Sequence, residues 1–441
     1  MADITEGSAA ELGRRIAAGA QDPVELTDAF LEKAGEHAFR DDIFARMTPD
    51  RARAEAHAAR ARASEGRRLS PLDGVPISWK DLFDTAGVAT EAGTAMMAGR
   101  VPETDAEVLA RATAAGTVCL GKTHMTEIAF SGLGVNPVTA TSPNRHDPSL
   151  APGGSSSGSA ASVAYGLAPL SIGSDTGGSV RLPSAWNDLV GFKPTHNALP
   201  LDGVVPLVPS FDTVGPLAQT VEDAALAFAV MGGAAVPLDG ADMRGARLLI
   251  CETVAMADVE DAPGSAFENA VSRLSAAGAQ VERAELPFLA RAFEITAPLY
   301  TSEAWAEWRE HVERDGDKMF YQVRNRVAAG ATFKAYEFIE AWTGLRALRQ
   351  SWAEAVAGYD AVLMPSVPIL PPPVSKLLED DDFYVTRNLM ALRNTRIGNL
   401  MGLCGISLPT GIASCGIMMC GLPGSDARLL RLAQAVERAL G

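Results

Sequence analysis

Residues 151–161 read APGGSSSGSAA, a run of small residues that leads directly into a predicted helix rich in Ala and Ser. Its glycines allow the backbone to turn tightly and to approach a ligand closely. A flexible Gly/Ser linker has a similar composition, but a linker does not sit between a helix and a strand that are both buried. A phosphate cradle at a helix N-terminus is a second alternative, but the Gly-Lys-Ser/Thr of the Walker pattern is absent. We therefore interpret the run as part of a binding or catalytic site.

A second Gly/Ser element, SDTGGSVRLP, occupies residues 174–183. In this element Gly177 and Gly178 directly precede Ser179. Consecutive N–H groups in a glycine turn can converge on one oxygen atom and form an anion nest. Beside a serine nucleophile the same nest serves as an oxyanion hole. The element therefore favours acyl-transfer chemistry, although either Gly/Ser element alone is weak evidence.

A third element, GVPISWKD at residues 74–81, places Lys80 in a short apolar strand that leads into a turn. Only seven of the 38 basic residues are Lys, so Arg is the usual surface cation of this chain. Burial of a Lys disfavours its charged form and lowers its pKa. A neutral Lys amine can act as the general base for a hydroxyl group. None of the six histidines shows a recognisable elbow or metal spacing, so we predict neither a His-based triad nor a metal site.

Outside these elements, helical and strand patterns alternate along the chain, which is typical of an α/β fold. Residues 288–358 differ, because they combine large aromatic residues and many charges with helical periodicity; we predict a helical insertion that lies over the sheet. No repeat and no long linker divides the chain, so residues 1–441 are expected to form one domain. Helices are expected at about 8–18, 24–37, 49–65, 105–116, 157–168, 266–276 and 428–440, and strands at 74–81, 117–122, 170–174, 248–251, 281–286, 361–364, 406–408 and 416–420.

The composition limits the possible partners. With 441 residues, 47% of them hydrophobic, the chain can form a large core. A net charge of -16 disfavours direct contact with nucleic acid. No stretch reaches the roughly 18 uninterrupted apolar residues of a membrane span, and the start lacks a secretory signal. The five cysteines form neither a metal pattern nor a disulfide framework. We expect buried free thiols in a cytoplasmic protein.

Taken together, the three elements resemble the amidase signature family, in which the same motifs occur in this order and at similar spacing. Lys80 lies 75 residues before Ser155, and Ser155 lies 24 residues before Ser179. The resemblance continues in VGFKPT at 190–195, GPLAQTVED at 215–223 and YDAVLMP at 359–365, and it thins out between about 240 and 358. It implies an α/β/α domain around a large, mixed, twisted sheet. It also implies that no metal, nucleotide or organic cofactor is needed, and that a homodimer is possible.

The resemblance also implies roles for individual residues. Ser179 corresponds to the nucleophile, Ser155 to a bridging serine that follows a cis peptide bond, and Lys80 to the base. The oxyanion hole corresponds to the N–H groups of Thr176, Gly177, Gly178 and Ser179. Ser174 is expected to support the Lys–Ser network. Arg181 is expected either to orient Asp175 or a substrate carboxylate, or to form a structural ion pair. The acyl pocket corresponds to Ala129, Phe130 and Ser131. His124 stands where the family usually has Asn, and it either touches substrate or is a hydrogen-bonded structural histidine.

Three functions are compatible with these motifs. The first is a stand-alone hydrolase of small amides or carbamates; the apolar surroundings of the motifs favour an uncharged acyl group. The second is the glutaminase-type subunit of an amidotransferase that works with partner subunits and tRNA; the segment KTHMTEI replaces the KTNMDEF-type segment usual there. The third is a binding protein without activity, which the intact Lys80, Ser155 and Ser179 disfavour.

Overall fold

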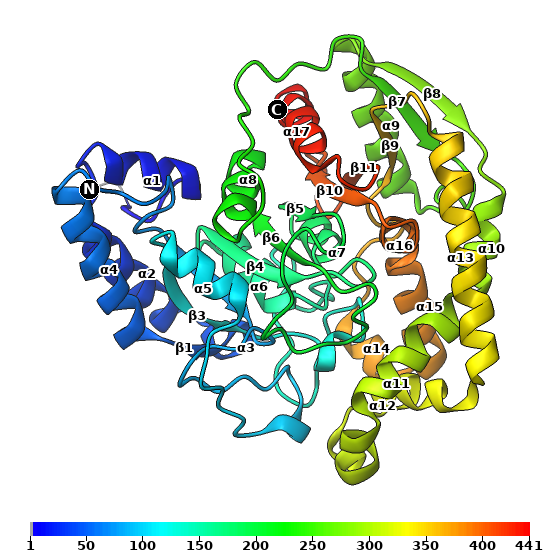
Figure 1. Ribbon diagram of the computed structural model, residues 1–441, viewed down its shortest axis with the longest axis horizontal. Helices are drawn as coiled ribbons and strands as arrows, with labels where there is room; N and C mark the ends of the chain where they lie inside the picture. The colour runs from blue at the N-terminus through cyan, green and yellow to red at the C-terminus, as the bar shows by residue number, and fades with distance from the viewer. Residues whose placement is uncertain (1–2) are drawn as a thin grey trace.

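A mixed sheet of 11 strands forms the centre of the computed structural model, which describes residues 3–441. Figure 1 shows the sheet passing from the N-terminal helices on one side of the molecule to the helices of residues 288–358 on the other. The strand order is β1-β3-β2-β4-β6-β5-β10-β11-β9-β7-β8. The strands are β1 Phe44–Met47, β2 Pro76–Lys80, β3 Val118–Thr123, β4 Leu170–Ser174, β5 Val190–Lys193, β6 Val214–Ala218, β7 Arg247–Cys251, β8 Gln280–Ala284, β9 Ala361–Pro365, β10 Cys404–Pro409 and β11 Gly416–Gly421.

The sheet combines both strand directions. The β2 strand runs parallel to both of its neighbours, β3 and β4, whereas the central strands from β4 through β6, β5, β10 and β11 to β9 pair antiparallel. Every residue of β2, β3 and β4 is buried. A strand covered on both faces favours apolar and small residues, which hold most positions of these strands, and this explains why they could be predicted from the sequence. The α/β fold class is confirmed.

Helices surround the sheet and pack against it, with α6 on β2, β3 and β4, α7 on β5 and β10, and α17 on β10 and β11. The helices are α1 Ala9–Ala17, α2 Pro23–Glu36, α3 Arg40–Ile43, α4 Pro49–Ser64, α5 Glu107–Ala114, α6 Ser157–Ala164, α7 Arg181–Trp186, α8 Val221–Val230, α9 Asp261–Ala276, α10 Phe288–Glu294, α11 Thr296–Asp315, α12 Tyr321–Ala328, α13 Ala335–Ala355, α14 Val374–Glu379, α15 Asp381–Ala391, α16 Arg393–Leu400 and α17 Asp426–Leu440, with short 3-10 helices at Ala95–Met97, Glu127–Ala129, Gly316–Lys318 and Ala329–Thr332.

The helix boundaries follow local chemistry. Ser8 caps α1 in a reciprocal arrangement with Glu11, and Asp22 caps α2 just before Pro23. The α6 helix ends at Ala164, four residues earlier than the predicted end at 168, because Gly166 takes a φ of 67° that a helix cannot continue through.

Some elements were not predicted. The strands β1, β5 and β6 are short, and β6 contains Gly215 and Pro216, residues that usually argue against a strand. The helices α14, α15 and α16 also lacked a sequence signal, although α16 contributes to the site described below. Residues 288–358 are helical as predicted, and Figure 1 shows α10 and α13 along one side of the molecule.

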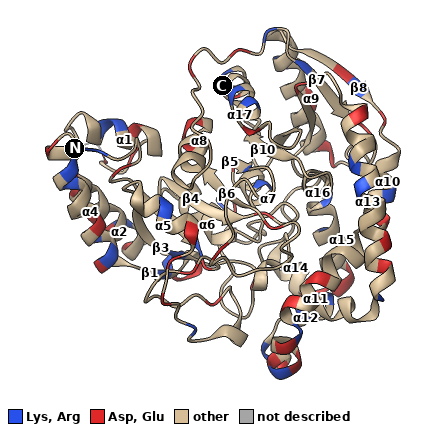
Figure 2. Cartoon of the chain, in the orientation of Figure 1, with Lys and Arg blue, Asp and Glu red and all other residues tan. Residues whose placement is uncertain are grey.

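Charged side chains are concentrated on the outer helices, and Figure 2 shows acidic and basic residues mixed along them, while the central sheet has few. None of the helices within residues 3–441 is both long enough and apolar enough to cross a membrane. All five cysteines are free and buried, as predicted.

Candidate active site

Lys80 stands at the end of β2, and its side chain is fully buried. The neighbouring parallel strand β4 ends at Ser174, so the carboxyl ends of the two strands bring both residues to one edge of the sheet. The Lys80 Nζ atom donates hydrogen bonds to Ser174 Oγ at 2.8 Å and to Ser155 Oγ at 2.7 Å. The structure therefore brings together three residues that lie up to 94 positions apart in the chain.

Burial lowers the pKa of Lys80 to about 7, although the negative charges of Asp175 and Asp212 partly oppose the shift. At neutral pH, Lys80 is then a neutral amine in a large fraction of the molecules. A neutral amine that contacts a hydroxyl group can accept its proton, which is the chemistry of a general base.

Ser155 lies in the turn between Leu150 and α6, and the peptide bond between Gly154 and Ser155 is cis. Backbone atoms surround this turn closely: a Cβ atom on Gly154 would lie 2.7 Å from the Cα atom of Gly134. The next residue, Ser156, donates its N–H to the Ser179 carbonyl oxygen at 3.3 Å and its hydroxyl to the Ser174 carbonyl oxygen at 3.2 Å. The two Gly/Ser elements of the sequence are thus joined side by side.

Ser179 lies in the turn that follows β4, and an ion pair holds this turn in place. The Asp175 carboxylate accepts hydrogen bonds from Arg181 Nη2 at 2.9 Å and Nε at 3.0 Å, and from the N–H of Val180 at 3.2 Å. Burial opposes the ionisation of Asp175, but the Arg181 charge outweighs it and holds the pKa of Asp175 at about 2. Arg181 is itself completely buried. Of the roles considered from the sequence, the structure shows Arg181 in a buried ion pair with Asp175.

The backbone of this turn leaves its donors free. Among the hydrogen bonds of residues 3–441, none uses the N–H of Thr176, Gly177, Gly178 or Ser179 as donor. Gly178 has a φ of 139°, and a Cβ atom there would lie 2.0 Å from Thr395 Oγ1, so only glycine fits this position. Four successive free N–H groups in a tight turn can hold an oxyanion.

A narrow pocket opens beside Ser179, and its lining includes two segments that were predicted to belong to the site. Ala129, Phe130 and Ser131 line it, together with residues of the 174–183 element. Ile128 and Ala129 have positive φ angles of 43° and 61°, so the chain turns sharply where it borders the pocket. The complete lining is Ala129, Phe130, Ser131, Thr176, Gly177, Ser179, Leu207, Tyr300, Arg326, Leu392 and Arg396.

His124 does not line this pocket. It lies near α3 and β1, where its backbone N–H donates to the Ile43 carbonyl oxygen at 2.9 Å and its ring interacts with the backbone of Asp41. Burial lowers the pKa of His124. Of the two roles left open by the sequence, the structure supports the hydrogen-bonded structural histidine.

The sequence-based interpretation missed several residues of the pocket. Tyr300 of α11 donates its hydroxyl to the Thr176 carbonyl oxygen at 3.0 Å and stacks on Phe211 with ring centroids 4.4 Å apart. Arg326 of α12 and Arg396 of α16 bring two guanidinium groups into the wall. These residues lie more than 100 positions after Ser179 in helices that carry many charges, and no local signal separates them from surface arginines. The expectation of an uncharged acyl group rested on apolar residues around the motifs, and these two arginines remove its basis.

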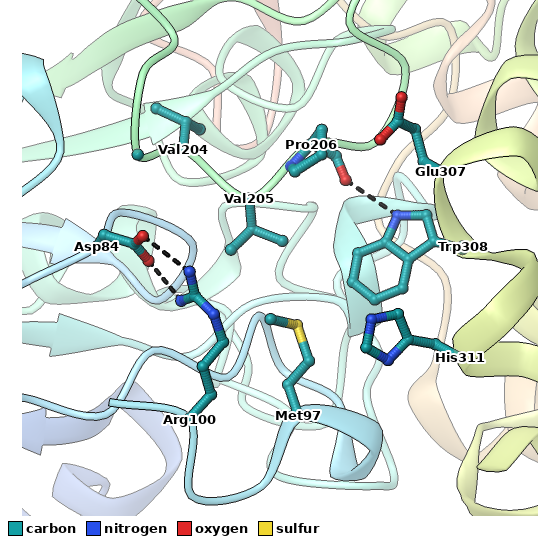
Figure 3. Close-up of a pocket in the computed structure, with 10 residues that line it drawn as sticks. Asp84, Met97, Arg100, Val204, Val205, Pro206, Glu307, Trp308 and His311 are labelled. Atoms are coloured by element: carbon teal, nitrogen blue, oxygen red, sulfur yellow. Dashed lines mark hydrogen bonds and ion pairs between the residues drawn. The ribbon is translucent and has the colours of Figure 1, made fainter. Parts of the chain in front are cut away.

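A larger cavity of about 250 Å³ lies on the other side of the loop before Leu207 (Figure 3). Trp308 donates its indole N–H to the Pro206 carbonyl oxygen at 3.0 Å, and Arg100 pairs with Asp84 at 2.8 Å. None of its lining residues is a Ser, Thr, Cys or Lys, so it lacks a hydroxyl or thiol nucleophile, whereas Ser179 lines the narrower pocket. Within residues 3–441, no group of three or more His, Cys, Asp or Glu is placed to hold a metal ion.

Comparison with known proteins gives a family for this arrangement. The amidase family model matches residues 25–430. A 2-amino-5-chloromuconic acid deaminase from Comamonas testosteroni is 34% identical, and the match covers 89% of this chain and 87% of the relative. A glutamyl-tRNA(Gln) amidotransferase subunit from Salinispora arenicola (strain CNS-205) is 32% identical over 100% of this chain and 99% of its own length. A crystal structure of an amidase superposes with a TM-score of 0.89 at 30% identity, covering 99% of this chain and 100% of that structure.

A hydrolase of C–N bonds is the class that this fold and these relatives define. The chain belongs to the amidase signature family.

Proposed function

We propose that this chain is a self-sufficient amidohydrolase that cleaves a small amide through an acyl-enzyme on Ser179, with Ser155 as the bridging serine and Lys80 as the base. One observation carries the proposal. The desolvated Lys80 amine contacts Ser155, next to a turn in which the N–H groups of residues 176–179 donate to no acceptor among the described residues.

In the first half of the reaction, Ser179 Oγ attacks the carbonyl carbon of the substrate. Its proton passes to Ser155 Oγ, and the Ser155 proton passes to the neutral Lys80 amine. The N–H groups of residues 176–179 hydrogen-bond to the oxyanion that forms. The Ser155 and Ser179 hydroxyls are not hydrogen-bonded to each other in the structure, so the relay requires one of these hydroxyls to rotate toward the other.

In the second half, the relay returns the proton to the leaving nitrogen as the C–N bond breaks, and an ester between the acyl group and Ser179 remains. Water then attacks this ester, and the relay takes the proton of the water and returns one to Ser179 Oγ. The products are an amine or ammonia and a carboxylic acid.

Residues 288–358 are proposed to cover the substrate entrance. Tyr300 and Arg326 of this segment stand in the pocket wall, and Trp308 is hydrogen-bonded to the loop that carries Leu207. In support of a small acid substrate, the name of the Comamonas relative describes the removal of an amino group from an acid.

The experiment is to incubate the purified protein with aliphatic amides, monoamides of dicarboxylic acids, acyl anilides, aryl carbamates and glutamine, and to measure released amine or ammonia. Ser179→Ala should lower kcat by roughly 10⁴-fold or more. Ser184→Ala is the matched control, because Ser184 is a buried serine of α7 outside the pocket, and it should keep the rate of the native protein. Hydroxylamine added as an acceptor should give a hydroxamate if an acyl-enzyme forms. Full turnover by Ser179→Ala would refute the proposal.

The second candidate is a glutaminase-type subunit, which the full-length match to amidotransferase subunits supports. In the same panel, a protein of this kind would hydrolyse glutamine only when its partners are added. Turnover of other amides by the chain alone would exclude this candidate.

A further inference from the structure

The pocket beside Ser179 contains a buried positive charge without a partner. Arg396 projects from α16, and only 6% of it is exposed. Its Nη2 atom is buried and has no hydrogen-bond partner. Within residues 3–441 it also forms no ion pair, although the chain contains many. An ionised guanidinium taken out of water without a counter-ion is costly, so such groups are normally paired.

A second guanidinium group stands in the same wall. Arg326 lies over the Phe130 ring, 4.3 Å from its centroid, and donates Nη1 to the Phe130 carbonyl oxygen at 3.0 Å. It has no carboxylate partner among the described residues either. Burial and the nearby charge of Arg396 lower the pKa of Arg326 to about 10. Because both arginines line the same narrow pocket, their like charges repel each other, and an anion between them would relieve this repulsion.

The Arg396 guanidinium lies close to the turn that precedes Ser179. A Cβ atom built on Gly177 would lie 3.9 Å from Arg396 Nε and 4.0 Å from the Tyr300 ring, so the guanidinium approaches the turn whose N–H groups face the reacting carbonyl. Thr395, the preceding residue, donates its hydroxyl to the Gly177 carbonyl oxygen at 2.9 Å and holds α16 against this turn. A group bound by Arg396 therefore lies only a few bonds from the carbonyl that Ser179 attacks.

We propose that Arg396, together with Arg326, binds a carboxylate on the acyl part of the substrate, so that the enzyme hydrolyses monoamides of short dicarboxylic acids. This inference rests on the proposed function. A carboxylate suits the site, because it can accept two parallel hydrogen bonds from one guanidinium group.

The same pocket discriminates against glutamine. None of its lining residues is acidic. The nearby Asp175 is paired with Arg181, and Asp212 accepts hydrogen bonds from Thr176, Leu207 and Val208. The ammonium group of glutamine would lose water in this pocket without gaining a partner. The monoamide of glutaric acid, which has the chain of glutamine without its amino group, should be the better substrate.

The test compares the monoamides of succinic and glutaric acid with butyramide, valeramide and glutamine. The native protein should hydrolyse the monoamides with a kcat/KM roughly 100-fold above that of the neutral amides and of glutamine. Arg396→Met should remove this preference, mainly by raising KM for the monoamides, and should leave the neutral amides unchanged or faster. Arg393→Met is the matched control, because Arg393 is a half-buried arginine of the same helix outside the pocket, and it should keep the preference.

Equal losses on charged and neutral amides in Arg396→Met would overturn the proposal, because a residue that stabilises the oxyanion or only the fold affects both substrates alike. Hydrolysis of glutamine as fast as the glutaric monoamide would also overturn it.

A binding measurement separates this inference from the proposed function. If the protein hydrolyses no amide, glutarate should still raise the Tm of the native protein and not that of Arg396→Met, while butyrate should raise neither. That result would keep the anion site and reject the amidase mechanism. No stabilisation by any dicarboxylate would reject the anion site.

Discussion

Two buried lysines on neighbouring strands differ in what surrounds their amino groups. Lys80 on β2 reaches only the hydroxyl oxygens of Ser155 and Ser174, whereas Lys122 on β3 lies 3.2 Å from the carboxylate of Asp81. Both side chains are fully buried. The difference teaches that burial alone does not assign a role to a lysine. Burial lowers the pKa of both amines, but the Asp81 carboxylate stabilises the ammonium form of Lys122 and ties strands together, while hydroxyl partners accommodate the neutral amine that a base requires.

The arginines repeat the contrast. Arg181 supports the turn that carries Ser179 and is paired with Asp175, whereas Arg396 lines the pocket and has no hydrogen-bond partner for its buried Nη2 atom among the described residues. In both pairs, one basic residue has a carboxylate partner within the chain (Lys122 with Asp81, Arg181 with Asp175), and the other (Lys80, Arg396) has none within hydrogen-bond distance among the described residues.

The largest expected effect comes from Lys80→Met. We expect kcat to fall by about 10⁴-fold, because the relay loses its proton acceptor. The free energy of unfolding should change by only about 1 kcal/mol, since the two hydroxyls left behind are neutral and can find other partners. Steady-state kinetics and denaturant unfolding measure the two quantities. A large loss of stability with partial activity would show that Lys80 is structural like Lys122.

Lys122→Met should give the opposite result. Removal of this amine leaves the buried Asp81 with the partly exposed Arg46 as its one cationic partner among the described residues, beside the N–H of Glu91, so the free energy of unfolding should fall by about 3 kcal/mol. Activity per folded molecule should stay within a few-fold of the native protein. Urea unfolding, together with kinetics at a temperature where the variant is folded, tests this. An inactive variant of native stability would move Lys122 into the site.

The pH dependence should show the smallest effect. The amine of Lys80 must be neutral to accept a proton, and its pKa is about 7, so protonation removes the base as the pH falls below this value. The kcat/KM value should therefore rise with pH to a plateau above pH 7 and fall about tenfold for each unit below it. A midpoint near 10 would mean that Lys80 is charged at neutral pH, and a flat profile from pH 5 to 8 would require another base.

The parts of the site that the sequence predicted depend on short segments. Lys80 stood out because only seven of the 38 basic residues are Lys and this one lies in an apolar segment, and Gly178 because a tight turn needs glycine. Both signals involve only a few neighbouring residues. The buried strands β2, β3 and β4 were predictable for the same reason, since each is a short segment with apolar or small residues at most of its positions.

The sequence did not predict site residues whose contacts come from segments distant in the chain. Arg326 and Arg396 belong to helices that carry other charges, and helical periodicity cannot say which of them ends beside Ser179. The acyl group was expected to be uncharged because the residues around the motifs are apolar, and nothing in those segments indicated the two arginines. The role of His124 was also left open, because its neighbours Asp41 and Ile43 come from a helix that the sequence did not reveal.

By itself, the sequence determined the α/β class, the family and the residues of the proposed catalytic relay, since glycine turns and apolar strands are written in consecutive residues. Only the tertiary structure decided which buried charges have a partner. A guanidinium or an amine acquires its pKa and its role from groups that other elements bring within a few ångströms, and that proximity depends on how the whole sheet and its helices pack.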